Sequence, residues 1–77
     1  MFDFSALIGK FTEAGFTRQT FAKELGISKN SMTNKLSGNY PFKVDEIAKA
    51  CDVLDISSGE IGRYFFTEKV EVSKQTR

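Results

Sequence analysis

Apolar residues recur at helical spacing in five separate stretches of this chain. The first stretch has the i, i+3, i+4, i+7 spacing that places residues on one face of a helix, at Phe4, Leu7, Ile8 and Phe11. We expect the side chain of Asp3 or Ser5 to cap this helix, because both residue types accept hydrogen bonds from free backbone N–H groups. Gly15 is suited to the left-handed conformation that ends such a helix.

Two short helices joined by a tight turn are predicted next, over residues 17–36. Thr17 is the expected cap of the first, and Gly26 is expected to end it. Ile27 is an apolar residue within the turn, so we expect its side chain to fill the angle between the helices. Ser28 can cap the second helix.

Pro41 interrupts the helical pattern after this unit, because proline lacks the backbone N–H that a continuous helix needs. A fourth helix follows, and its predicted apolar face consists of Val44, Ile47, Ala48, Cys51 and Leu54. Asp45 and Glu46 lie in its first turn, where the helix dipole favours acidic side chains.

A short fifth helix is predicted from Ser57 and Glu60, which have the spacing of a capping box. The chain then changes character, because valine alternates with charged residues as in a short strand, at Val70 and Val72. A frayed terminus explains the same segment equally well.

The composition fits one small domain. A chain of 77 residues buries only ~60% of its unfolded surface, which disfavours a deep catalytic cleft. We expect a compact all-α domain of five helices over residues 1–66, followed by a C-terminal tail over residues 67–77. With Cys51 as the single cysteine and no histidine, we expect no disulfide, metal or cofactor. There is no signal-peptide pattern or membrane-spanning apolar run, so the expected location is the cytoplasm.

Basic residues are concentrated in one part of the chain. Residues 16–43 hold five basic residues and one acid, a net charge of +4, whereas the whole chain has a net charge of +1. No acid occurs within residues 27–44. Because carboxylates are repelled by phosphates, this segment is a candidate for contact with nucleic acid.

The helix predicted over residues 28–36 has hydrogen-bonding groups on its outer face. At about 100° per residue, four side chains fall within an arc of roughly 140°: Lys29, Asn30, Thr33 and Asn34. Met32 and Leu36 lie outside this arc, ~40° apart, and can pack inward. Ammonium, amide and hydroxyl groups match the donors and acceptors of DNA base edges. The pattern is also typical of a solvated surface helix.

These features resemble the helix-turn-helix of the small phage repressors, the Cro and repressor group. The resemblance rests on Ala22 and Gly26, four residues apart, and on Met32, six residues further on. It extends over most of the chain through two later segments, Asp45-Glu46-Ile47 and Tyr64-Phe65-Phe66 with a basic tail. It implies a lambda-repressor-like domain in which the second helix braces the DNA backbone and the third enters the major groove.

The resemblance also implies roles for single residues. Base contacts are implied for Lys29, Asn30 and Asn34, with Thr33 on the same face. Phosphate contacts are implied for Arg18, Gln19, Ser31, Lys35, Asn39, Tyr40 and Lys43. Two of these depart from the family pattern, because Lys35 stands where an apolar residue is usual and Lys43 where a capping Ser or Thr is common. We expect Leu36 to take over the packing role of residue 35.

The predicted fifth helix ends in three successive aromatic residues, Tyr64, Phe65 and Phe66. Three successive side chains cannot all face the core from one helix. At least one should be exposed in a monomer. A symmetric homodimer would bury it, with Val70 as a further contact candidate, and the alternative is a closed monomer core.

We therefore expect a sequence-specific transcriptional regulator that binds a double-stranded DNA operator, with no membrane or small-molecule partner. If the chain is phage-encoded, it acts in the cytoplasm of the bacterial host. The alternative function is a small helical protein-interaction module, or an antirepressor, that uses Phe65 and Phe66 against another regulator. An enzyme is not expected, because residues 26–31 lack the spacing of a phosphate-binding loop and histidine is absent.

Overall fold

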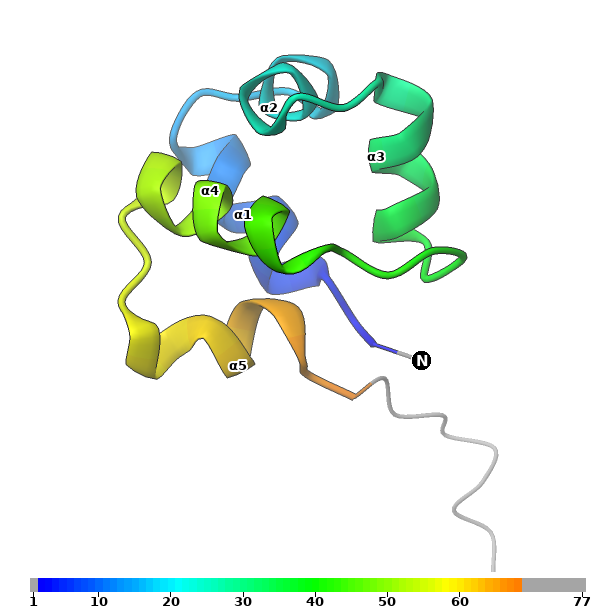
Figure 1. Ribbon diagram of the computed structural model, residues 1–77. Coiled ribbons are helices and arrows are strands. Elements are labelled where there is room, and N and C mark those ends of the chain that lie inside the picture. Colours follow the sequence, from blue (N-terminus) through cyan, green and yellow to red (C-terminus); the bar gives the residue numbers. More distant parts are fainter. Residues whose placement is uncertain (1, 69–77) are drawn as a thin grey trace, which may run out of the picture.

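Five α-helices account for most of residues 2–68, the part of the chain that this computed structural model describes (Figure 1). They are α1 (Ser5–Glu13), α2 (Arg18–Leu25), α3 (Lys29–Leu36), α4 (Val44–Leu54) and α5 (Ile61–Phe65). A short 3-10 turn, η1 (Ser58–Glu60), precedes α5. The prediction of an all-α domain with five helices is confirmed.

Local capping chemistry defines the first two helices. The N-cap position of α1 is Phe4, so neither Asp3 nor Ser5 is the cap that the sequence predicted. The Asp3 carboxylate nevertheless accepts a hydrogen bond of 2.9 Å from the Ser5 N–H, the first N–H of the helix. Gly15 follows α1 with φ of 94°, a left-handed conformation that glycine adopts without steric cost. At the start of α2, the Thr17 hydroxyl accepts from the Thr20 N–H, and the Thr20 hydroxyl accepts from the Thr17 N–H. This reciprocal pair is a capping box.

All five helices contribute apolar side chains to one core. Phe11 of α1 and Phe21 of α2 stack with ring centroids 4.6 Å apart. Full burial of a large apolar side chain stabilises a fold by about 1.5–3 kcal/mol, so these rings are a main source of stability. The buried set is Phe4, Leu7, Phe11, Phe21, Ala22, Leu25, Met32, Leu36, Ala50, Leu54, Ile56, Tyr64 and Phe65.

The predicted apolar face of α4 is wrong at two positions. Val44 is 85% exposed and Ala48 is also exposed, whereas Glu46 and Ala50 are buried. The helix is rotated about its axis relative to the prediction because Glu46, a charged residue, faces α3 and pairs there with Lys35.

The start of α5 also differs from the prediction. The Glu60 N–H donates to the backbone carbonyl of Ser57 over 2.9 Å, and the Ser57 side chain makes no capping hydrogen bond. The predicted capping box is therefore replaced by the 3-10 turn η1, in which a backbone carbonyl satisfies the Glu60 N–H.

The N-terminal segment runs beside the residues that follow α5. The Asp3 N–H donates to the Thr67 carbonyl over 2.7 Å, and Phe2 and Glu68 form an antiparallel bridge. The first two residues of the predicted tail thus contact the helical domain. The valines of the predicted strand, Val70 and Val72, lie outside the described residues.

The three successive aromatic residues point in different directions. Tyr64 and Phe65 are buried in the monomer core, and Phe66 is 52% exposed. The prediction that at least one of them is exposed is confirmed. The choice of Tyr64 and Phe65 as dimer-contact candidates is wrong, because both side chains are buried in the core of the same chain.

Candidate nucleic-acid interface

A short turn connects α2 to α3. Gly26 ends α2 in the left-handed conformation, with φ of 76°, and the Ile27 N–H donates to the Ala22 carbonyl over 3.0 Å. The half-buried Ile27 packs against the core, as predicted. The Ser28 hydroxyl then accepts from the Ser31 N–H over 3.1 Å and caps α3. In Figure 1, α2 is seen nearly along its axis at the top of the molecule, whereas α3 runs from top to bottom at the right.

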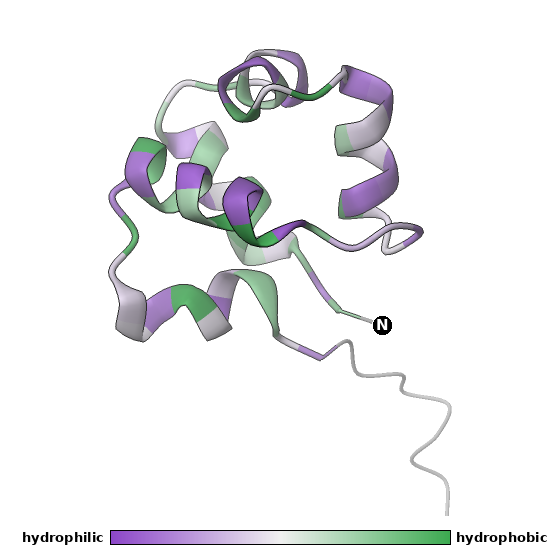
Figure 2. Ribbon diagram, in the orientation of Figure 1, coloured by the Kyte–Doolittle hydropathy of each residue, from purple (hydrophilic) through white to green (hydrophobic). Residues whose placement is uncertain are grey.

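The two sides of α3 have different environments. Met32 is 0% exposed and Leu36 is also buried, as predicted for the inward side. Lys29 and Asn30 are exposed, and Thr33 and Asn34 are partly exposed. We call these four residues the polar face. Figure 2 shows hydrophilic segments along the outer side of α3.

The loop after α3 contacts the polar face. The Asn39 side-chain amide donates to the Asn34 side-chain oxygen over 3.2 Å. The Ser37 hydroxyl donates to the Thr33 carbonyl over 2.8 Å. These two bonds place the beginning of the loop over residues 37–43 directly beside the polar face.

Most of the predicted phosphate-contact residues lie at the surface of the elements that adjoin α3. Arg18 and Gln19 are exposed in the first turn of α2, and three exposed residues lie in the loop between α3 and α4, namely Asn39, Tyr40 and Lys43. Ser31 is half-buried on α3. Because α2 meets one end of α3 and the loop leaves the other, both ends of the polar face are flanked by candidate residues (Figure 1).

Lys35 does not belong to this surface, and its predicted phosphate contact is wrong. The side chain is buried, with 7% exposure of the residue, and its ammonium lies 2.6 Å from Glu46 Oε1. The ammonium also donates to the Pro41 carbonyl over 3.4 Å and lies 5.9 Å from the centre of the Phe42 ring. Residue 35 therefore faces inward, as an apolar residue would, and its charge is paired inside the protein.

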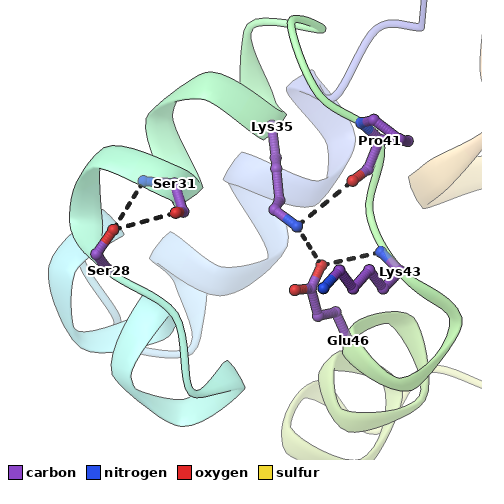
Figure 3. A network of polar contacts seen from close by, with 6 residues as sticks. All are labelled: Ser28, Ser31, Lys35, Pro41, Lys43 and Glu46. Carbon is purple, nitrogen blue, oxygen red and sulfur yellow. Dashed lines mark hydrogen bonds and ion pairs between the residues drawn. The ribbon is translucent and has the colours of Figure 1, made fainter.

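Glu46 is the residue that the sequence reasoning missed. Its Oε1 atom accepts both from the Lys35 ammonium and from the Lys43 N–H, the latter over 2.9 Å (Figure 3). The second bond caps α4, which explains how a lysine can occupy the capping position. The signal that could have identified Glu46 is Lys35, because a lysine at an inward-facing position of a helix predicts a buried acid beside it.

Other polar chemistry in the described residues is limited. Burial, and secondly the neighbouring Asp52 carboxylate, raise the pKa of the Cys51 thiol. Within residues 2–68, no group of three or more His, Cys, Asp or Glu side chains could hold a metal ion. Among the same residues, no helix has the length and apolar character needed to span a bilayer.

An apolar pocket of about 250 Å³ lies between the N-terminal segment, the loop before α4, and α5. Three of its lining residues are exposed aromatics, Phe2, Tyr40 and Phe66. The Phe2 and Phe66 rings meet edge to face, with centroids 5.6 Å apart. The pocket is a second surface feature, distinct from the polar face.

Comparison with known proteins assigns the chain to a family. No curated protein matches the chain. The profile of a family described as "Protein of unknown function (DUF739)" matches residues 1–68, which is most of the sequence. This chain therefore belongs to the DUF739 family.

Proposed function

We propose that this protein is a sequence-specific transcriptional regulator, similar to phage repressors and Cro, that inserts α3 into the major groove of a double-stranded DNA operator. The polar face supports the proposal most strongly, because its hydrogen-bonding side chains lie on the outward side of a helix that follows a helix and a short turn. Because no acid occurs within residues 27–44, α3 itself carries no carboxylate that phosphates would repel.

The side chains of the polar face suit particular base edges. An asparagine at position 30 or 34 can form two hydrogen bonds with adenine, and Lys29 can donate to the acceptors of guanine. Thr33 offers a hydroxyl and a methyl group, and the methyl suits the methyl of thymine. The proposed phosphate contacts, which fix register but carry no sequence information, come from Arg18, Gln19, Ser31, Asn39, Tyr40 and Lys43. Regulation then follows from occupancy of the operator, without catalysis.

Random-site selection tests this proposal. The purified protein is incubated with a pool of randomised duplexes, and bound sequences are amplified and read. We expect one enriched site, bound less tightly as salt rises because phosphate contacts release counterions. Lys29→Glu should abolish binding, whereas Lys49→Glu, the same change at an exposed lysine of α4, should retain it. A folded protein that enriches no sequence is evidence against the proposal.

The exposed aromatic residues favour a second candidate function, a protein-interaction module or antirepressor. Phe2, Tyr40 and Phe66 surround the apolar pocket, and such patches commonly mark contact surfaces. Retention on a DNA column at low salt separates the candidates. A protein-interaction module would not be retained, and Lys29→Glu would not change its elution.

A homodimer is a related proposal, in which a second copy covers Phe66. Repressors of this class bind paired half-sites ~34 Å apart, so a palindromic selected site would indicate two copies. Sedimentation of wild type and Phe66→Ser tests the contact directly. We expect the substitution to shift the protein toward the monomer.

A further inference from the structure

A buried ion pair connects α3 to α4. Lys35 lies in the last turn of α3 and Glu46 in the first turn of α4, and each residue is 7% exposed. Their charged atoms are 2.6 Å apart. In the described residues, these are the two charged residues that the core buries.

Net stability alone does not explain such a pair. Removing two charges from water costs about as much as their attraction returns, and well-packed apolar residues often replace a buried pair without loss. A hydrogen-bonded ion pair is directional, whereas an apolar contact is not, because the pair is favourable only when donor and acceptor meet in one geometry. Pairs of this kind can therefore specify one arrangement of the elements that they join.

The pair also reaches the loop between the two helices. Glu46 Oε1 accepts from the Lys43 N–H over 2.9 Å, and the Lys35 ammonium donates to the Pro41 carbonyl over 3.4 Å. The same ammonium lies over the Phe42 ring. As Figure 3 shows, one ammonium and one carboxylate join the end of α3, loop residues 41–43 and the start of α4.

These contacts lie next to the proposed DNA-binding residues. Asn34 of the polar face directly precedes Lys35, and the loop that the pair holds contains Tyr40 and Lys43. A major-groove helix and a phosphate-binding loop must meet one duplex at the same time. If the orientation of α3 relative to the loop changed, the base contacts of α3 and the phosphate contacts of the loop could not both be made well at the same time.

We propose that Lys35 and Glu46 are positioning residues, which fix the polar face of α3 relative to the loop over residues 37–43 and touch no DNA themselves. The inference rests on the proposed function. It assigns to Lys35 a role opposite to that of Lys29, although both are lysines of the same helix.

A double variant tests the proposal while preserving the fold. In Lys35→Met with Glu46→Gln, methionine keeps an unbranched apolar stem and glutamine keeps an oxygen that accepts from the Lys43 N–H. We expect thermal unfolding within a few degrees of wild type, because the double variant leaves no buried charge without its partner. The matched control is Lys49→Met with Asp52→Asn, the same chemical changes at exposed positions of α4.

Affinity for the selected operator is the first measurement. We expect the double variant to bind about tenfold more weakly, equivalent to ~1.4 kcal/mol, and the control to bind like wild type. The slope of log affinity against log salt should be unchanged, because Lys35 makes no phosphate contact. A slope lower by ~1 would show direct phosphate contact and overturn the proposal. Unchanged affinity in a folded double variant would also overturn it.

Backbone residual dipolar couplings give a second measurement that needs no DNA. We expect the N–H vectors of α3 to change orientation, or to average, relative to α4 in the double variant, while α1 keeps its wild-type couplings. If wild type selects no DNA site, the proposed function fails, and these couplings still decide whether the pair positions α3. Couplings of α3 that equal those of wild type contradict the positioning role.

Discussion

The outer and inner sides of α3 place the same kind of side chain in different environments. Lys29 and Lys35 are six residues apart, yet Lys29 is exposed and Lys35 is buried against Glu46. The exposed lysine can bind a partner outside the protein, whereas the charge of the buried lysine is already neutralised inside it. Position relative to the core, more than residue type, thus decides which polar groups of a helix can serve binding.

The strongest test of this difference is removal of the inner lysine. Lys35→Ala leaves the Glu46 carboxylate buried without its counter-charge, and we expect a loss of about 3–5 kcal/mol in the free energy of unfolding. Urea denaturation measures the loss. Lys29→Ala is the matched substitution on the outer side and should change stability by less than about 0.5 kcal/mol. Equal losses of unfolding free energy in the two variants would contradict the different environments of Lys29 and Lys35.

Packing on the inner side gives the next effect. Met32 is fully buried, and Met32→Ala should cost about 2–5 kcal/mol because it leaves a cavity in the core. Val44→Ala should cost little, because Val44 is 85% exposed. Thermal unfolding of the two variants also tests the orientation of α4. A large loss at Val44 would support the face that the sequence pattern predicted.

On the outer side, a substitution should affect binding and leave stability unchanged. Asn30→Ala should lower the affinity for the selected operator by ~1–3 kcal/mol and relax specificity at one base pair. Titration of labelled duplexes that carry each base at that position measures both effects. If the variant binds every duplex as wild type does, Asn30 makes no base contact.

The smallest expected effect is at the edge of the interface. Arg18→Ala should weaken binding to all DNA sequences alike and lower the salt slope by ~1, as expected for a phosphate contact. Binding measured at several salt concentrations gives the slope. Loss of discrimination between operator and random DNA would instead place Arg18 among the base contacts.

The sequence predicts those parts of the fold that depend on local signals. The cap at Thr17, the left-handed Gly15 and Gly26, and the inward side chains of Met32 and Leu36 depend on residues close in the chain. Helical spacing and capping rules describe such relations directly.

The errors come from contacts between residues distant in the sequence, or from alternatives of similar energy. The orientation of α4 depends on a pair eleven residues apart, Lys35 and Glu46, and no helical period reveals such a pair. At Ser57, a 3-10 turn and a capping box both satisfy the Glu60 N–H, so the sequence pattern could not choose between them. The polar face follows from helical geometry, but whether it binds DNA depends on a partner outside the chain.

The central claim, that the outer side of α3 contacts DNA bases, is tested most directly by NMR titration of isotope-labelled protein with the selected duplex. The side-chain amide signals of Asn30 and Asn34 report on base contact, and the backbone signals of Gly9 in α1 and Gly62 in α5 serve as internal references. We predict that the two asparagine signals shift most and the two glycine signals least. Shifts confined to α1 and α5, with both asparagine signals unchanged, would contradict the claim.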